Sequence, residues 1–548
     1  MTSHLDYLTY RKLRAPSEHE GVHIEPSLEE AWSLLENNCR ALALFDGTIG
    51  GLSSARKSAE ARAHLLDAAC KYTRTYLPEA VCDTPPAPDR IVLAGHQPAL
   101  FHPGVWFKNF ALDYVARSCD APAINLVIDS DDFRAPLLRV PAGTPESPRI
   151  EYVPFDIGSQ KQPFEERRLL DRSTAESFAD RVLRAAGAIL DEPMLPRFWP
   201  MVLDRLEATG YWGLAVAQAR HRLEHEWGLR TLEVPQSVVC ESRAFARFAV
   251  HLLSRLDQFV EIHNHVLSVY RRVHHLRNRA QPVPDLATAE DGRLEAPFWL
   301  WTRDDPTRRR MFVRRNRGCL AIGDETGDRF CLPLEGDNLE PAIDAWMAAA
   351  ASGLRLRSRA LITTMYARLV LGDLFLHGIG GAKYDQVTDA IMHAFFGAPA
   401  PGYMILSATF RLAPGRRNIR EDELTLRRFD EELRRMTWQP ERYLRSVLHT
   451  LSPDDAQTVS QWIAEKQAWI EAEVTPANYR ERFLAIRELN RRLSEFLADR
   501  RAKLEQERAA LRRRVHAQSV LGNREYAFCL HNERELRDFF ARHVPRVS

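Results

Sequence analysis

Two continuous apolar runs constrain the fold more than any other feature of this chain. The first, Arg90–Gly95, ends in glycine, and the second, Ala123–Asp129, ends in an acid. A helical pattern over Gly104–Arg117 separates them. Runs without polar alternation indicate strands covered on both faces, as in a parallel sheet flanked by helices. The sequence therefore predicts an α/β fold with a parallel sheet core.

Further segments extend this pattern along the chain. Strands are expected at 150–155, 231–235, 374–381 and 403–410, and an antiparallel pair at 294–301 and 311–315. Helices are expected at 28–37, 53–77, 165–190, 196–227, 242–277 and 384–396. The strand at 374–381 runs directly into a glycine turn.

Changes in composition divide the chain into three regions. Residues 1–88 form an N-terminal helical segment that ends in the proline-rich boundary Thr84–Asp89. Residues 89–415 form the α/β core with helical insertions. Residues 416–548 are rich in charged helices, and Leu497, Leu504 and Leu511 recur every seven positions. The other seam position is often charged, so we expect a packed antiparallel hairpin with a turn at Thr475–Pro476.

The charge balance excludes some classes of function. The 548 residues include 75 basic and 74 acidic residues, for a net charge of +1. A protein built to grip nucleic acid or an anionic membrane needs an excess of positive charge. The most apolar segment, 360–376, carries Arg368 and Asp373 and is too short and polar to span a bilayer. The N-terminus lacks the apolar core of a signal peptide.

The cysteine pattern indicates a cytosolic protein. The eight cysteines are scattered without a CxxC pair or zinc-finger spacing. Such cysteines are typical of reduced thiols in the cytosol. We therefore expect a cytoplasmic protein with no membrane partner, no nucleic-acid partner and no metal ligands of its own.

The first candidate site lies where the first strand meets the first helix. At the carboxyl end of a parallel strand, a ligand can meet a glycine backbone and the N-terminal amides of the next helix. His96 and His102 are candidates for proton transfer near neutral pH. The alternative is an ordinary turn in which a histidine caps the helix. The binding candidates here are Gly95, Gln97, Gly104, Lys108 and Asn109.

The second candidate site is the acidic loop that follows the second strand. Asp129, Asp131 and Asp132 repel one another unless a cation or donor is near. Such a cluster can hold Mg²⁺, a substrate amine or a ribose hydroxyl. The alternative is a helix N-cap followed by a solvated loop.

The third candidate site is the glycine turn after the strand at 374–381. Its strand, glycine turn and helix have the layout of a phosphate-binding loop, without matching a Walker A or GxGxxG pattern. The alternative, equally compatible with the sequence, is a tight turn followed by a capped helix. The candidate binding residues are Gly378, Gly380, Gly381, Lys383 and Tyr384.

Two other features carry less functional weight. His263-Asn264-His265 spells a nuclease-like triplet, but it lies in a helical pattern where residues two apart do not share a face. The run Arg308–Arg317 is rich in arginine, but alternation along a strand would send at most half of these side chains into one pocket. No GxSxG motif and no reactive cysteine context is present.

At these segments the chain resembles the cysteine-adding enzyme family of bacillithiol biosynthesis. The resemblance spans most of residues 90–548, in the same order as the family. It is carried by Ala94–Leu100, Val127–Phe133, Glu295–Trp301 with Arg310–Val313, and Leu356–Ile362 through Gly378–Tyr384.

The resemblance implies a Rossmann-like core related to class I aminoacyl-tRNA synthetases, and a C-terminal helical coiled-coil hairpin linked to homodimerisation. It implies a ligase that joins a cysteine-like amino acid to an amino-sugar acceptor by an amide bond. Because a free carboxylate is a poor electrophile, the expected activating cofactor is ATP or ADP with Mg²⁺. The expected catalytic residues are His96, His102, Asp131 and Asp132.

The chain departs from the family within this site. His96 stands where the family carries glutamine, and the later turn lacks the family's acid. His102-Pro-Gly-Val matches half of the synthetases' HxGH signature, and no KMSKS-like loop is present. These departures point to a divergent branch. The alternative function is a non-catalytic metabolite-binding or scaffold protein that dimerises through its C-terminal helices.

Overall fold

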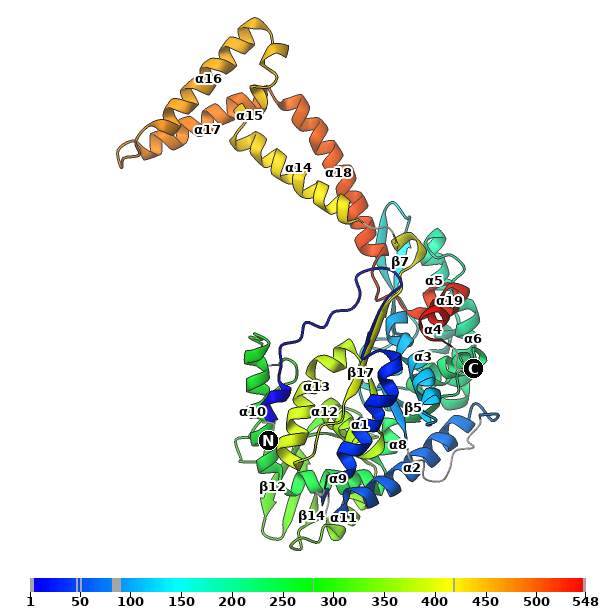
Figure 1. The fold of residues 1–548 in the computed structure, drawn as a ribbon. Coiled ribbons are helices and arrows are strands. Elements are labelled where there is room, and N and C mark those ends of the chain that lie inside the picture. The colour runs from blue at the N-terminus through cyan, green and yellow to red at the C-terminus, as the bar shows by residue number, and fades with distance from the viewer. Residues whose placement is uncertain are drawn as a thin grey trace.

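A six-stranded mixed sheet forms the centre of the computed structural model (Figure 1). The structure describes residues 4–45, 48–49, 52–80, 90–278, 280–416 and 419–545. The strand order is β1-β17-β16-β4-β5-β10; β1 is antiparallel to β17 and the other neighbours are parallel. The strands are β1 (Gly21–Glu25), β4 (Val92–His96), β5 (Ala123–Val127), β10 (Leu232–Pro235), β16 (Leu374–Gly378) and β17 (Tyr403–Thr409).

Helices cover both faces of this sheet, as the apolar runs predict. Val92 and Ala94 of β4 enter one core cluster, and Ile91 and Leu93 enter the other. The first cluster holds α1 (Ala31–Ala43), α3 (Pro103–Ser118), α5 (Phe178–Ala186), α6 (Leu195–Thr209) and α7 (Trp212–Glu226). The second holds α2 (Ser54–Arg74), α8 (Gln236–Cys240), α9 (Arg243–Ser254), α10 (Leu256–Val273), α12 (Ala360–Tyr366) and α13 (Ile379–Ile391).

A second, antiparallel sheet of five strands packs into the second cluster together with α11 (Glu340–Ala351). The predicted pair at 294–301 and 311–315 is confirmed as two neighbouring strands of this sheet. In order, the strands are β14 (Gly327–Pro333), β13 (Cys319–Asp324), β12 (Arg309–Asn316), β11 (Leu294–Thr302) and β15 (Leu354–Ser358).

The expectation that every cysteine is a reduced thiol is wrong for one pair. Cys319 on β13 and Cys331 on β14 form a disulfide, with their Cα atoms 6.1 Å apart. Pairing of the two strands places Cys331 opposite Ala321, two residues from Cys319. The twelve-residue spacing reveals no such contact until the hairpin is known. Five other cysteines in the described residues are free.

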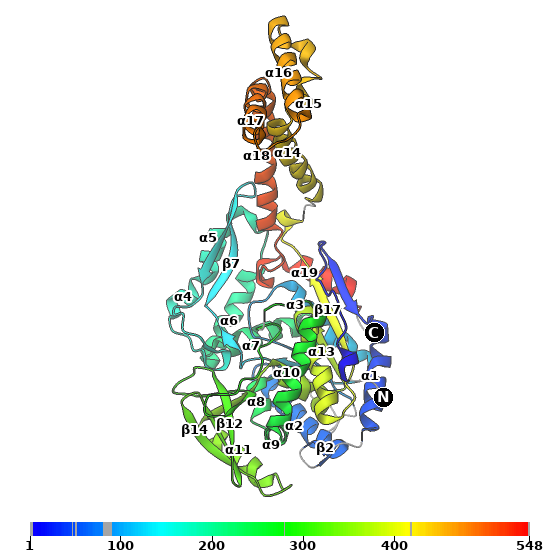
Figure 2. The same ribbon diagram turned by 90° about the vertical axis from the view of Figure 1, so that its left-hand side faces the viewer.

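Long helices form an arm that projects from the core (Figures 1 and 2). The turn predicted at Thr475–Pro476 lies between two neighbouring helices, α16 and α17, but the pattern over 483–515 is broken at Phe496–Leu497. A separate apolar cluster, which includes Leu433, Val459 and Leu493, holds the arm together. The arm helices are α14 (Arg420–Trp438), α15 (Glu441–Leu444), α16 (Pro453–Glu471), α17 (Tyr479–Glu495) and α18 (Ala498–Leu521).

After the arm, the chain returns to the core. Tyr526–Val544, which includes α19 (Glu533–His543), joins the cluster around α3. The rings of Phe540 and Phe110 stack with centroids 4.0 Å apart. Part of the region 416–548 therefore belongs to the core rather than to the arm. The predicted boundary at Thr84–Asp89 lies outside the described residues.

Several further elements differ from the sequence predictions. The N-terminal segment expected to be helical also supplies β1 to the main sheet, and the helices expected over 165–190 and 196–227 are each divided. The strand at 150–155 is β8 (Pro148–Pro154), which pairs with β7 (Leu137–Gly143) in a hairpin outside the main sheet. The helix expected over 242–277 is divided at Arg255 into α9 and α10. Within the described residues, no helix combines the length and apolar character that crossing a membrane requires.

Another difference, at the start of a helix, bears on the candidate site. Helix α13 begins at Ile379 rather than Tyr384. Gly380 and Gly381 therefore belong to its first turn, and Gly378 is its N-cap residue. The glycines lie in a strand-to-helix junction without an intervening loop.

Candidate functional site

A cavity of about 790 Å³ opens at the carboxyl edge of the main sheet. Because β4, β5 and β16 are parallel, the turns after them meet at this edge. Further walls come from β11, β17, α10, the segment 283–286, the start of α12 and a segment after α18. The cavity brings together most of the predicted residues: Gly95, His96, Gln97, His102, Gly104, Lys108, Asp131, Gly378, Gly380, Gly381, Lys383 and Tyr384.

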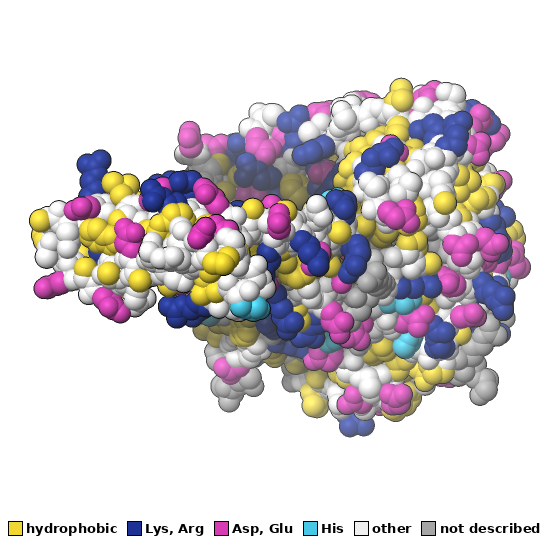
Figure 3. Space-filling model, turned by 90° about the horizontal axis from the view of Figure 1, so that it is seen from above, with side chains coloured by type: hydrophobic (Ala, Val, Ile, Leu, Met, Phe, Trp, Pro, Cys, Tyr) yellow, Lys and Arg dark blue, Asp and Glu magenta, His cyan; other side chains and the backbone are white. Residues whose placement is uncertain are grey.

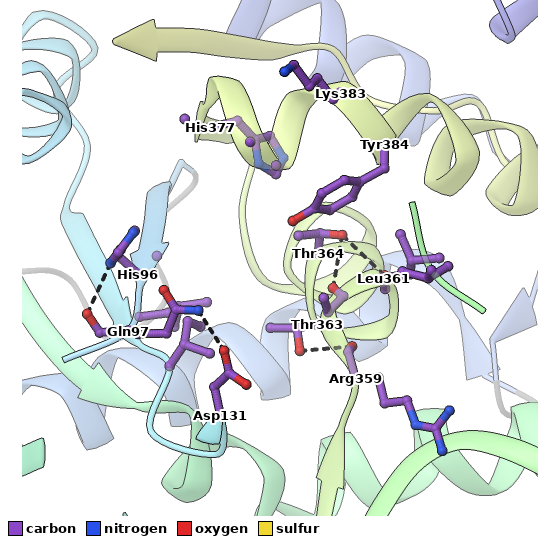
Figure 4. Close-up of a pocket in the computed structure, with 18 of the residues that line it drawn as sticks. His96, Gln97, Asp131, Arg359, Leu361, Thr363, Thr364, His377, Lys383 and Tyr384 are labelled. Carbon is purple, nitrogen blue, oxygen red and sulfur yellow. Dashed lines mark hydrogen bonds between the residues drawn. The ribbon is translucent and has the colours of Figure 1, made fainter. Parts of the chain in front are cut away.

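Asp131 links three segments on one side of the cavity (Figure 4). The amide of Gln97 donates to its carboxylate at 2.6 Å, and Arg308 lies 3.0 Å away. Arg308 also pairs with Asp132 at 2.7 Å. Arg308 therefore provides the positive charge that the acidic loop requires. Asp132 is not among the residues that line the cavity.

Two predicted binding residues lie outside the cavity lining in the structure. Asp129 is buried and accepts hydrogen bonds from the backbone and hydroxyl of Ser237, at the start of α8. Asn109 is buried and donates to Glu224 at 2.7 Å. Both have hydrogen-bond partners inside the protein, and the structure does not place Asp129 or Asn109 among the residues that line this cavity. Sequence alone could not separate these roles, because both residues lie beside true lining residues.

The two predicted proton-transfer histidines are held as neutral side chains. Burial, reinforced by the charge of Lys108, lowers the pKa of His96 to about 3, and its Nδ1 lies 3.1 Å from the carbonyl of Gln97. His102 accepts from the amide of Gly104 at 3.1 Å and so caps α3. Burial and Arg524 lower its pKa to about 3. His102 thus takes the capping role, and neither histidine carries a proton to donate as an acid at neutral pH.

Lys108 is a buried cation in the cavity lining. Its side chain is 3% exposed, and its ammonium donates to the carbonyl of Gly95 at 2.5 Å. In the described part of the chain it forms no ion pair. Burial, with the nearby charge of Arg220, lowers its pKa to about 7. A buried ammonium without a carboxylate is stabilised by an anionic ligand.

The first turn of α13 lines the same cavity as Lys108. Gly378, the N-cap residue, provides no side chain to cap the helix. A Cβ atom added to Gly378 or Gly380 would meet no atom within 4 Å. The leading amides of this helix are therefore next to open space, in a geometry that suits a phosphate or carboxylate.

Several lining residues were missed by sequence reasoning. Arg359 donates to Glu295 at 2.8 Å, and its guanidinium lies 4.1 Å from the ring centroid of Trp299. Arg524 donates to Ser407 on β17 at 3.2 Å. Arg524 lies outside every predicted motif, and Arg359 lies in the Leu356–Ile362 segment of the resemblance, to which no site role was assigned. The arginine-rich run at 308–317 was a usable signal, and its Arg308 does line the cavity.

The nuclease-like triplet lies on α10, and its first residue, His263, is among the residues that line the cavity. His263 and His265 lie on α10, as the helical pattern predicts. His263 is buried, and its Nδ1 lies 3.1 Å from the side-chain oxygen of Asn264. Among the described residues, no group of three or more histidine, cysteine or acidic side chains is arranged to hold a metal ion.

Comparison with known proteins adds no relative: no family model matches the chain, and no curated protein matches it.

Proposed function

We propose that this protein is an amide-forming ligase of the kind that the cysteine-adding enzyme of bacillithiol biosynthesis represents. It joins a cysteine-like amino acid to an amino-sugar conjugate. The observation that carries this proposal is convergence: all four segments of the resemblance contribute to one cavity. Gln97, Asp131, Trp299 and Tyr384 come from these four segments, which are separated by as many as 287 positions.

The finer description of the fold belongs to the same proposal. The parallel part of the sheet, β17-β16-β4-β5-β10, together with its helices suits a Rossmann-like core. The packed arm helices α14 and α18 suit a coiled-coil hairpin. Hydrophobic side chains interrupt the charged surface of the arm (Figure 3), as a homodimer contact requires. The large exposed apolar residues of the arm are Leu424, Trp438, Ile470, Val474, Tyr479, Phe483 and Leu484.

The charges of the cavity fit an acidic substrate and a phosphate-bearing cofactor. Lys108 and the leading amides of α13 offer donors to an anion. ATP with Mg²⁺ would supply the activation that turns a carboxylate into an acyl donor. The chain's residues bind the phosphates, orient the acyl group and exclude water. Arg308 already neutralises Asp131 and Asp132, so these carboxylates are poor ligands for a free magnesium ion.

The test is a binding panel followed by product analysis. Cysteine, other amino acids, glucosaminyl-malate, ATP and ADP are offered singly and in pairs, with binding followed by calorimetry. Mass spectrometry then detects an amide product in complete mixtures. We expect ADP binding to weaken at least tenfold in Lys108→Met. Lys71→Met, an exposed lysine beside Asp67 on α2, is the matched control.

A second candidate function is supported by the same arm. A metabolite-binding scaffold would use the cavity to sense a ligand and the arm to hold a second copy. Ligand binding without any amide product, over the full set of mixtures, would favour this reading. An amide product lost in Lys108→Met would exclude it.

A further inference from the structure

His377 occupies a position that the proposed function does not yet use. It lies near the end of β16 and lines the cavity (Figure 4), although its side chain is only 5% exposed. Its Nε2 atom lies 2.7 Å from the carboxylate of Asp385, two turns into α13. Strand β16 and helix α13 therefore hold a histidine and an acid together at the cavity.

Asp385 is fixed by partners other than His377. Arg368 donates to it at 2.6 Å, and the hydroxyl of Thr364 donates at 3.0 Å. Although burial opposes ionisation, the contact with His377 and the positive charge of Arg368 hold the pKa of Asp385 below its usual range. The carboxylate is thus an ionised acceptor in a fixed place.

This acceptor determines where the proton of His377 lies. Burial lowers the pKa of His377, which favours the neutral ring with a single proton. A carboxylate oxygen lies 2.7 Å from Nε2 and would repel a lone pair there, which favours the proton at Nε2. The remaining lone pair is on Nδ1, which is the atom able to accept a proton.

Gly381 keeps the space beside Nδ1 open. A Cβ atom at this position would lie 2.8 Å from Nδ1 of His377, closer than a real Cβ atom is found. The absence of a side chain at Gly381 therefore prevents a clash with Nδ1 of His377. It leaves the accepting face of the imidazole uncovered at the glycine-lined part of the cavity.

We propose that His377, positioned by Asp385, accepts the proton of the nucleophilic amine at Nδ1. This inference rests on the proposed function, with an acyl phosphate or acyl adenylate as the activated donor. The amine nitrogen forms a bond to the acyl carbon. The bond from that carbon to the phosphate oxygen breaks, and its electron pair leaves with the phosphate. The amine proton passes to Nδ1, and Asp385 stabilises the resulting imidazolium.

The groups around His377 are mixed in charge. Asp385 on α13 faces it with negative charge, and Arg368 and Lys108 contribute positive charge. The rings of Phe375 and Tyr403 pack beside it, with centroids 4.4 and 5.0 Å away. Protonation of His377 in the reaction is therefore favoured by Asp385 and opposed by burial, Arg368 and Lys108, so the imidazolium readily returns its proton.

The first test measures the proton itself. In protein labelled with ¹⁵N-histidine, the signal missing from His377→Gln identifies His377. The wild type is expected to show a neutral ring with its proton on Nε2 at pH 7, and Asp385→Asn is expected to show a mixture of tautomers. A proton on Nδ1 in the wild type overturns the proposal. Should His377→Gln fail to fold, Gly381→Ala identifies the signal through its displacement.

The second test measures function. His377→Gln is expected to bind ADP within threefold of the wild type, while the single-turnover rates of His377→Gln and Gly381→Ala both fall at least 100-fold. His449→Gln, on the arm, is the matched control. Unchanged rates in both variants overturn the proton-acceptor role. If no amide forms with any substrate, the ligase proposal fails, and the tautomer measurement still decides whether the dyad exists.

Discussion

The amide of Gln97 donates a 2.6 Å hydrogen bond to Asp131, which ties the turn after β4 to the acidic loop after β5. Arg308, from the segment before β12, reaches the same carboxylate at 3.0 Å. Three segments that the sequence separates by up to 211 positions thus share one acceptor. The contact fixes one side of the cavity, and the fixed side is where β4 and β5 end.

Loss of Arg308 should therefore destabilise the protein through its two acidic partners. Arg308→Met leaves Asp131 and Asp132 adjacent without a cation. Since both carboxylates are about one-third exposed, we expect a loss of about 1 kcal/mol in the free energy of unfolding. In a urea unfolding series, adding Asp131→Asn should restore part of that loss. Strictly additive effects would show that the pair does not interact.

Lys108 should make the stability depend on pH in the neutral to alkaline range. Its pKa is about 7 in the folded protein and about 10.4 in an unfolded chain. Between these values the unfolded state binds more protons, so stability rises as pH increases from 7 to 10. Below pH 7 the destabilisation by the charged lysine is complete.

Lys108→Met removes this dependence. At pH 7 the variant should have a larger free energy of unfolding than the wild type. This difference should shrink by on the order of 3 kcal/mol between pH 7 and pH 10. Chemical unfolding at several pH values measures it, with Lys71→Met as the control that should follow the wild-type profile. Parallel profiles for Lys108→Met and the wild type would contradict the buried, unpaired state of the lysine.

The main sheet could be predicted from its apolar runs, whereas the partners of the polar residues could not. Continuous runs such as Ala123–Val127 are buried on both faces, and that burial is a local property of the sequence. Whether Asp129 binds a ligand or Ser237 depends on a contact across 108 positions. The start of α13 was misplaced because glycine has a low helix propensity, while Gly381 is retained to clear His377.

Arg368 should be essential to the stability of the core beside the cavity. It donates to Asp385 and Asp389 at 2.6 Å each, and all three side chains are nearly or fully buried. Arg368→Met leaves two buried carboxylates without their cation, which should cost about 3–5 kcal/mol. Urea unfolding measures this cost. Arg491→Met, an exposed arginine paired with Glu488 on the arm, should leave the midpoint unchanged.

Gly104 should tolerate no side chain, for a reason unrelated to ligand binding. A Cβ atom there would lie 2.0 Å from the carbonyl oxygen of Ala408 on β17. Because the obstacle is backbone, Gly104→Ala must separate α3 from the sheet, and we expect a loss of about 3 kcal/mol. Gly380→Ala, in open space on a helix, should leave the unfolding midpoint equal or slightly higher. Equal midpoints for all three proteins would contradict the close approach.

The two ends of the arm meet at its base, which allows the arm to be removed without cutting the core. A Cβ atom on Gly415 would lie 2.1 Å from the carbonyl oxygen of Leu521, so the chain leaves and re-enters the core at one point. A variant in which a short Gly-Ser linker joins Arg416 to Gly522 keeps α19 in its place against α3. Truncation near residue 415 would instead remove Phe539 and Phe540 from the core.

This arm-deleted variant should keep the fold and the cavity while losing self-association. Since the arm has its own apolar cluster, its removal exposes the core mainly where α18 meets β8 and Tyr526. We expect ADP affinity within threefold of the full chain, together with a change from dimer to monomer in sedimentation. The full chain with Trp438→Ser and Phe483→Ser, two exposed apolar residues of the arm, is the matched control for the interface and should also be monomeric. A dimer that persists without the arm would place the interface on the core, and loss of ADP binding would make the arm part of the site.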